Sequence, residues 1–344
     1  MGKFKPAWMV VLTGGVFGIF FSILVKLGNP PNMGTCLVCF IRDIAGGLRL
    51  HHVNQLSYLR PEIIGFILGS CIAGLAAKEF KAVGGSSPIL RFIISVFVAM
   101  GALVFLGCPI RAVGRLAGGD PTAVMGLVGL VVGTWIGVLF LKAGFTLGRA
   151  RQLGATNGWA ISVFALFLLV LLLTRPSFIF LNSEGHAPIL VSSITGLVIG
   201  FLAQRSRLCF VGGIRDVILM RSLHLFQGII AFFALCFVMN LLLGQFNLGE
   251  HPIGHTNHVA GFLGLLLVGW GSTLIGGCPF GQTVLAGYGN TDSGMSFLGM
   301  LVGAAFAHNF LLAGNPSGVS MYGLVAMLVG IGVFLVIGLT DRIA

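Results

Sequence analysis

Two short stretches of this chain follow one pattern, GALVFLGCP at residues 101–109 and GSTLIGGCP at residues 271–279. Both end in Gly-Cys-Pro, so that Cys108 and Cys278 stand 170 positions apart in the sequence. A glycine-rich apolar run that stops at a cysteine and a proline is not expected twice by chance. The pair predicts an internal duplication, and with it the arrangement of the whole chain.

A second motif supports the duplication. CLVCFIRD at residues 36–43 resembles CFVGGIRD at residues 209–216, and both read Cys-x-Val-x-x-Ile-Arg-Asp. Eight residues after each aspartate stands a histidine, His51 or His224. The offset is 173, close to that of the first motif. We therefore predict a first repeat over residues 1–175 and a second over residues 176–344.

The composition is that of a membrane protein. Of the 344 residues, 56% are hydrophobic and 8% are charged, against about 25% charged in soluble domains. The 53 glycines indicate closely packed helices. These values exclude a soluble enzyme, a disordered chain and a secreted disulfide scaffold. The net charge of +11 would suggest nucleic acid in a soluble protein, but here most basic residues stand between apolar runs, where they set orientation. No nucleic-acid partner is expected.

Ten apolar runs are long enough to cross a bilayer. They fall near residues 8–26, 61–77, 90–107, 123–142, 158–174, 188–204, 226–244, 257–277, 295–313 and 319–339. The first is expected to be a retained span, because no small-residue cleavage pattern follows it. An even number of crossings places both termini on one side, which the positive-inside rule makes cytoplasmic. The basic residues of that side are Lys3, Lys5, Lys78, Lys81, Arg91, Lys142, Arg149, Arg151, Arg205, Arg207, Arg215, Arg221 and Arg342. Residues 26–60 depart from the rule, since they fall outside and still carry Lys26, Arg42, Arg49 and Arg60.

Five crossings in each half make the two repeats inverted in the membrane, an arrangement typical of transport proteins. The segments that carry the motifs are too short or too polar to cross the bilayer. They span residues 33–50, 108–120, 206–222 and 278–290. We expect each to enter the membrane and return, the first two from outside and the last two from inside. The fold class is therefore an all-α polytopic membrane protein with short re-entrant helices and an hourglass shape.

Gly-Cys-Pro has a mechanical consequence. Proline is favoured at the first position of a helix, so Pro109 and Pro279 predict that Cys108 and Cys278 each cap a short helix. A helix N-terminus offers free N–H groups and about half a positive charge, which suits an anion. Gly107 and Gly277 let another backbone or a ligand approach closely.

The other cysteines differ in how strongly they indicate a site. Cys36 and Cys209 recur in both halves and are also candidates for the path. Cys39 has Gly212 at its matched position, and it is either a small filler or a partner of Cys36. Cys71 and Cys236 lie within spans and do not recur, as expected of small apolar fillers.

Charged and titratable residues around the motifs are supporting candidates. The pairs Arg42-Asp43 and Arg215-Asp216 either lock the re-entrant turns or lend charge to the path, and locking is the favoured interpretation. We expect His51 and His224 to be hydrogen-bonded interface residues rather than ligands. The histidines at positions 251, 255 and 258 lack zinc-site spacing and predict an exposed polar loop, so no metal site is expected.

The duplicated Cys-x-Val-x-x-Ile-Arg-Asp and Gly-Cys-Pro motifs resemble those of the YeeE/YedE sulfur-transport family, over nearly the whole chain. The full-length duplication also resembles the YedE-like branch associated with selenium metabolism. The resemblance implies an inner-membrane protein of hourglass shape that takes up thiosulfate or related species through central cysteines. At the matching positions these are Cys108 and Cys278, with Cys36 and Cys209.

These observations predict a transporter or channel for a small sulfur- or selenium-containing anion. Outer residues Arg42, Arg49 and Arg60 and inner residues Arg207, Arg215 and Arg221 would attract the anion. The thiols of Cys36, Cys108, Cys278 and Cys209, in that order, would pass it along as weak donors.

Two other functions fit less well. A membrane thiol–disulfide oxidoreductase would use Cys36 and Cys39, and a covalent persulfide relay lies between the two hypotheses. A neutral-solute channel of the aquaporin type is disfavoured, because its asparagine-rich half-helix signature is missing from the sequence. We expect no enzymatic activity and no cofactor. The expected surroundings are an inner membrane with both termini cytoplasmic, and a cytoplasmic sulfur- or selenium-carrier protein is an additional expected partner.

Overall fold

The computed structural model describes residues 6–250 and 252–341. Its long helices, of 15 to 20 residues, coincide with the ten predicted apolar runs. They are α1 (Ala7–Lys26), α3 (Pro61–Ala76), α4 (Pro88–Phe105), α6 (Ala123–Lys142), α8 (Ala160–Thr174), α9 (Ile189–Ser206), α11 (Phe226–Leu242), α12 (His258–Leu274), α14 (Thr291–Asn309) and α15 (Met321–Thr340). Seven helical segments of the described chain are long and apolar enough to cross a membrane, and α8 and α11 are shorter apolar helices. The all-α polytopic fold is confirmed.

Four short helices occupy the segments predicted to be re-entrant. They are α2 (Leu37–Gly47), α5 (Pro109–Ala117), α10 (Phe210–Met220) and α13 (Pro279–Gly287). The remaining elements are small: η1 (Asn54–Leu56), α7 (Ala155–Gly158), and the antiparallel strands β1 (Val83–Gly84) and β2 (Arg151–Gln152), in which Val83 pairs with Gln152.

One predicted span is displaced by about a turn at both ends. The apolar run is predicted at residues 295–313, whereas α14 is Thr291–Asn309. Its first turn is polar and escapes a hydropathy scan. Asn290 caps it, since its side-chain oxygen accepts a hydrogen bond from the Ser293 N–H at 2.8 Å.

Glycines set the closest helix contact, that of α6 against α12. A Cβ atom on Gly133 would lie 1.9 Å from the carbonyl oxygen of Leu266, and one on Gly129 would lie 2.2 Å from that of Phe262. Only glycine permits this approach. These glycines of α6 therefore pack within the protomer.

The helix contacts follow the proposed duplication. If α1, α3, α4 and α6 match α9, α11, α12 and α14, the packing of α3 on α9 should be mirrored by that of α1 on α11, and it is. The packing of α6 on α12 is mirrored by that of α4 on α14 in the same way. The last helix of each half departs, because α8 packs on α3 whereas α15 packs on α4 and α12. The mirrored contacts of the other helices support two repeats. The boundary between residues 175 and 176 stays a proposal.

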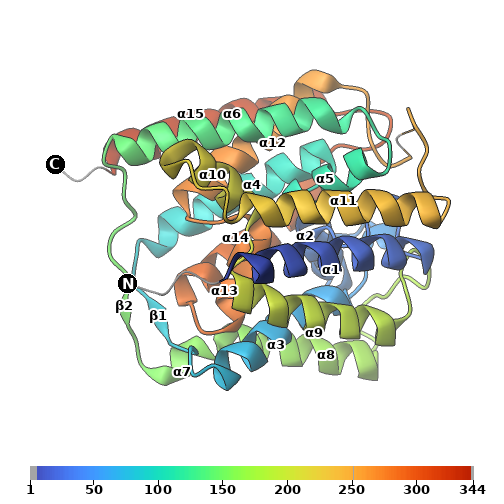
Figure 1. Ribbon diagram of the computed structural model, residues 1–344, viewed down its shortest axis with the longest axis horizontal. Coiled ribbons are helices and arrows are strands. Elements are labelled where there is room, and N and C mark those ends of the chain that lie inside the picture. Colours follow the sequence, from blue (N-terminus) through green and yellow to red (C-terminus); the bar gives the residue numbers. More distant parts are fainter. Residues whose placement is uncertain (1–5, 251, 342–344) are drawn as a thin grey trace.

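The predicted sides segregate in space. In Figure 1, α1 begins and α15 ends at the left, and α10 and α13 lie nearer that side than α2 and α5. Hydrogen bonds tie this face together, for example from the Thr146 N–H to the Asp341 carbonyl at 3.1 Å. The basic residues Lys3, Lys5 and Arg342 lie outside the described residues.

Candidate functional site

Each of the four short helices begins immediately after a cysteine. The caps are Cys36 for α2, Cys108 for α5, Cys209 for α10 and Cys278 for α13. The prediction of caps at Cys108 and Cys278 from the prolines that follow them is confirmed. Sequence reasoning missed the same position for Cys36 and Cys209, because no proline marks the start of those helices.

The first cysteine group consists of Cys36, Cys39 and Cys108. The Sγ atoms of Cys36 and Cys39 are 3.0 Å apart. The backbone N–H of Cys108 donates to Cys36 Sγ at 3.3 Å, so the starts of α2 and α5 meet here. All three side chains are at most 1% exposed. This group is enclosed.

The second cysteine group consists of Cys209 and Cys278, whose Sγ atoms are 3.3 Å apart. The N–H of Cys278 donates to Cys209 Sγ at 3.2 Å, the same contact that joins Cys108 to Cys36. Gly212 N–H donates to Cys209 Sγ at 3.3 Å and Gly281 N–H to Cys278 Sγ at 3.5 Å. Cys209 is partly exposed, unlike its counterpart Cys36.

Two helix N-termini therefore converge on each group. Each contributes roughly half a positive charge and backbone donors, and both face sulfur atoms that are weak donors and acceptors. Such a place favours a small anion.

The sequence predicts a line from Cys36 through Cys108 and Cys278 to Cys209. The structure brings the first two and the last two together, Cys108 through its N–H and Cys278 through its thiol and N–H. In the described residues no hydrogen bond connects a thiol of one group to a thiol of the other. The described residues show no direct contact between Cys108 and Cys278 through which the predicted transfer of the anion could occur.

Phenylalanines pack next to the groups. Phe280 and Phe210 directly follow the capped positions of α13 and α10, and Phe17 of α1 lies 5.1 Å and 6.4 Å from their rings, centre to centre. Phe21, also on α1, packs against Gly114 of α5, where a Cβ atom would lie 2.4 Å from the ring. Helix α1 thus links the surroundings of the two groups through apolar contacts.

A cavity of about 210 Å³ reaches the second cysteine group. Its lining includes Cys209, Gly277 and Gly281, with Arg207 and Arg215 as its cations. A water molecule takes up about 30 Å³ in the liquid, so the space suits a small hydrated or partly hydrated anion. Gly277 keeps it open, since a Cβ atom there would lie 3.9 Å from Cys209 Sγ.

A wider cavity of about 400 Å³ adjoins this one. The two share Arg207 and Tyr288, which are hydrogen-bonded to each other, and the wider one adds Lys78 and Lys81. Glu79 partly balances this charge by an ion pair with Arg207 at 3.1 Å. Basic residues thus line the route that the two cavities form from the surface to Cys209.

The two Arg-Asp motifs form ion pairs of different burial. Asp43 binds Arg42 at 2.7 Å and Arg60 at 2.6 Å, and all three are at most 5% exposed. Asp216 binds Arg215 at 2.8 Å with 14% and 25% of their side chains exposed. The expectation that Arg42 and Arg60 attract anions from outside is wrong, because Asp43 neutralises part of their charge inside the protein.

Histidine positions are partly as expected. His51 hydrogen-bonds the Arg42 carbonyl at 3.0 Å and stacks on His308 at 4.9 Å, and burial lowers the pKa of its imidazole. His224 is half-buried. In the described part of the chain no three His, Cys, Asp or Glu side chains are placed to hold one metal ion.

The expectation of an exposed histidine loop is wrong for His255. This side chain is 4% exposed, and its Nε2 lies 2.8 Å from the Val104 carbonyl, where burial lowers the pKa of the ring. His258 is exposed, and His251 lies outside the described residues.

Sequence reasoning missed two arginines beside the first cysteine group. Arg111 and Arg115 lie four residues apart on α5 and are both 1% exposed. Arg115 is neutralised by Asp120 at 2.7 Å. The sequence feature that could have indicated them is the presence of two arginines in a nine-residue helix after Gly-Cys-Pro. Charged residues at this depth in a membrane are rare and usually functional.

Parts of this chain are similar to known proteins. Residues 205–340, which hold the second cysteine group, match the Sulf_transp family, described as Sulphur transport. A thiosulfate transporter TsuA of Spirochaeta thermophila is 35% identical over 114 residues, which are 32% of this chain and 34% of that protein. A thiosulfate transporter TsuA of Escherichia coli is 29% identical over 117 residues, 34% of this chain and 33% of that protein. The matched segments span about a third of the length of these relatives.

Proposed function

We propose that the chain is a membrane transporter for a small sulfur-containing anion of the thiosulfate class and belongs to the YeeE/YedE sulphur-transport family, because residues 205–340 match the Sulphur transport family model. Similar selenium-containing anions are candidate substrates, as the YedE-like duplication suggests. The membrane is an inner membrane with both termini in the cytoplasm, and a cytoplasmic sulfur- or selenium-carrier protein receives the substrate. Enzymatic turnover is not required for this role.

One observation carries the proposal, the basic cavity that ends at Cys209. Arg207 and Arg215 supply charge there, and the N-termini of α10 and α13 supply oriented backbone dipoles. An anion in this cavity meets these positive charges and the Cys209 thiol among apolar side chains such as Leu208 and Leu225. A cation or a neutral sugar would gain much less from the same surroundings.

The thiols act as neutral donors in this mechanism. A thiolate 4 Å from a monovalent anion would repel it by about 4 kcal/mol at an effective dielectric constant near 20. An S–H group instead donates a weak hydrogen bond, which holds the anion and also releases it. The first and second cysteine groups then act as two successive weak sites, one in each half of the chain.

Uptake by reconstituted variants tests the proposal. We expect that Cys108→Ala and Cys278→Ala each abolish thiosulfate uptake into proteoliposomes, because each removes a thiol from one group. Cys71→Ala is the matched control and should keep uptake, since Cys71 lies mid-helix in α3 away from both groups. Full uptake by the double variant Cys108→Ala/Cys278→Ala would exclude the thiol mechanism.

A thiol–disulfide oxidoreductase is the second candidate, favoured by the 3.0 Å between the sulfur atoms of Cys36 and Cys39. Forming that disulfide would release two protons and pass two electrons to an acceptor such as a quinone. Thiol labelling before and after addition of a quinone distinguishes the two functions. A reversible Cys36–Cys39 bond that forms at a rate matching quinone reduction supports the oxidoreductase, and unchanged thiols exclude it.

A further inference from the structure

The two cysteine groups differ at two matched positions. Gly281, which lines the cavity at Cys209, corresponds at the offset of 170 to Arg111. Gly212, in the same lining, corresponds at the offset of 173 to Cys39. Where the second half has two residues without side chains, the first half has a guanidinium and a thiol.

At the first cysteine group, these two side chains occupy the space that corresponds to the cavity at the second cysteine group. A Cβ atom on Gly281 would lie 3.2 Å from Cys209 Sγ, so any side chain there would enter the cavity. At the first group Arg111 does this, and its Nη1 lies 3.8 Å from Cys39 Sγ. This explains why Cys209 is partly exposed while Cys36 and Cys39 are fully enclosed.

Besides its contact with Cys39, Arg111 is held by backbone carbonyls. It donates to the carbonyl oxygens of Asn32 at 3.1 Å, of Ile253 at 3.2 Å and of Leu106. These three residues come from separate segments of the chain. Within residues 6–250 and 252–341 no carboxylate lies within ion-pair distance of this guanidinium, whereas the neighbouring Arg115 has Asp120. A buried cation gains more from an anion than from neutral carbonyls.

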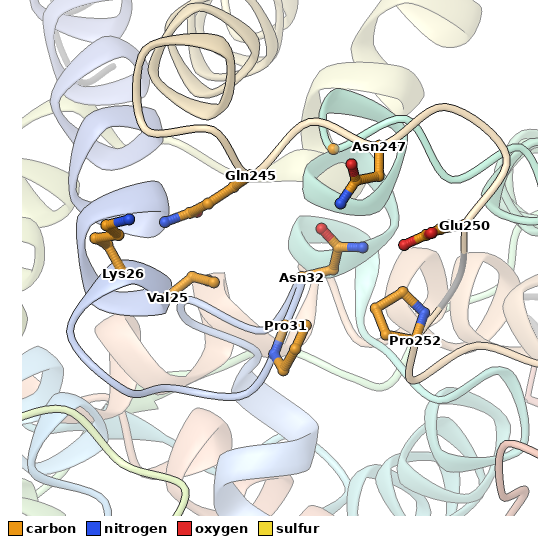
Figure 2. Close-up of a pocket in the computed structure, with 9 residues that line it drawn as sticks. Val25, Lys26, Pro31, Asn32, Gln245, Asn247, Glu250 and Pro252 are labelled. Carbon is orange, nitrogen blue, oxygen red and sulfur yellow. The ribbon is translucent and has the colours of Figure 1, made fainter.

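The carbonyls that hold Arg111 adjoin a second cavity. This cavity, of about 280 Å³, opens on the face opposite to the basic one and is lined by Asn32 and by Pro252, the neighbour of Ile253 (Figure 2). Through Asn32, Arg111 is hydrogen-bonded to a residue of the cavity lining, and through Ile253 to the neighbour of another. Asn32 and Leu106 have φ values of 53° and 64°, a left-handed conformation that is costly for residues other than glycine. The matched residue of Leu106 is Gly276, which adopts it freely.

We propose that Arg111 is the gate and the charge-selecting residue of the first cysteine group. The inference rests on the proposed anion transport. In the closed state its guanidinium fills the space beside Cys39 and ties Asn32 to Ile253. An anion that arrives in the outer cavity takes the place of the carbonyls, and Arg111 moves with it away from Cys39. A cation cannot replace the carbonyls as a partner of the guanidinium, so Arg111 stays beside Cys39 and the gate remains closed.

Thiol labelling of the purified protein in detergent tests the gate. The probes are two methanethiosulfonates of similar size, an anionic sulfonatoethyl reagent and a cationic trimethylammonium-ethyl reagent, and peptide mass spectrometry gives the rate at each cysteine. In the unchanged protein we expect Cys39 to react far more slowly than Cys209. Arg111→Gly, which gives the first group the residue of the second, should speed Cys39 labelling at least about tenfold, equivalent to about 1.4 kcal/mol.

A second variant separates the gate from the charge. Arg111→Lys keeps the cation but loses the fork that reaches three carbonyls. It should also speed Cys39 labelling while retaining a preference for the anionic reagent, and Arg111→Gly should lose that preference. The control Arg115→Gln/Asp120→Asn neutralises the neighbouring ion pair on the same helix and should leave the Cys39 rate within twofold.

Fully buried Cys236 reports unfolding, because it reacts only if the fold opens. If Cys39 reacts no faster in either Arg111 variant while Cys236 stays protected, the gate does not exist. If Arg111→Gly exposes Cys236, the Arg111→Lys result decides. None of these rates requires transport, so a loss of the proposed function would show separately, as absent thiosulfate uptake by the unchanged protein.

Discussion

At the residue scale, burial makes one sequence motif serve two purposes. Asp43 and Asp216 stand at the same position of Cys-x-Val-x-x-Ile-Arg-Asp. Asp43 is 1% exposed and holds two guanidiniums, those of Arg42 and Arg60, so it locks α2 to the start of α3. Asp216 holds one guanidinium near the rim of the basic cavity. The burial of the first pair favours the locking role that we expect for both pairs, and the second pair leaves Arg215 partly exposed.

Neutralising the two aspartates should therefore have unequal effects on stability. Asp43→Asn leaves two buried guanidiniums without a counter-charge, which costs about 3–5 kcal/mol in comparable buried pairs. Asp216→Asn alters a more exposed pair, for which about 0–1 kcal/mol is typical. Thermal unfolding of the purified variants in detergent measures the difference. Equal decreases in melting temperature would show that burial does not separate the pairs.

At the element scale, the helices are held by close backbone approach more than by large side chains. Gly133 lets α6 approach the Leu266 carbonyl of α12, a contact within the protomer that joins the two halves. In a membrane the hydrophobic effect does not drive helices together, so van der Waals packing at small residues has to do so. Gly332 on α15 is different, because nothing lies within 4 Å of the position of its Cβ atom.

One added methyl group should distinguish these glycines. Gly133→Ala places a carbon 1.9 Å from an oxygen and must separate α6 from α12, at a cost of more than the 1–3 kcal/mol typical of overpacking. Gly332→Ala should be neutral or stabilising by about 0.5–1 kcal/mol, since alanine is the better helix former. Size-exclusion profiles and melting temperatures of both variants provide the test. A tolerated Gly133→Ala would mean that this helix contact is looser than described.

At the scale of the whole molecule, the two faces differ in charge and access. On one face Lys78, Lys81 and Arg207 surround a cavity that continues to Cys209. On the other face a cavity with mixed charge, including Lys26 and Glu250, is lined by none of the residues of the enclosed first group. The molecule is thus open toward the face that the sequence predicts to be cytoplasmic and closed toward the other.

The basic approach should make transport sensitive to salt. Screening shortens from about 10 Å at 0.1 M salt to about 3 Å at 1 M, so the initial rate of thiosulfate transport from that face should fall as sodium chloride rises there. Lys78→Gln/Lys81→Gln should lower the rate at low salt and flatten its salt dependence. Arg149→Gln is the control, because this exposed residue does not line the cavity. An unchanged slope in the lysine variant would contradict electrostatic steering.

Local sequence patterns were sufficient to locate most of the helices. Hydropathy located the long helices, and a proline after Cys108 and Cys278 located two of the four cysteine caps, because both signals depend on residues next to one another. Polar starts escaped this reasoning, as at α14, where Asn290 caps a first turn that is not apolar.

The sequence by itself determined an all-α membrane protein with repeated motifs and two short helices that begin at Cys108 and Cys278. Tertiary structure alone decided which cysteines meet, since Cys36 contacts Cys108 across 72 residues and Cys209 contacts Cys278 across 69. It also decided that Asp43 forms an ion pair with Arg60. At the first group Arg111 lies beside Cys39, at the position matched by Gly281 in the second group. Periodicity and capping are read from neighbouring residues. The partner of a buried thiol or charge depends on which distant segments pack against it.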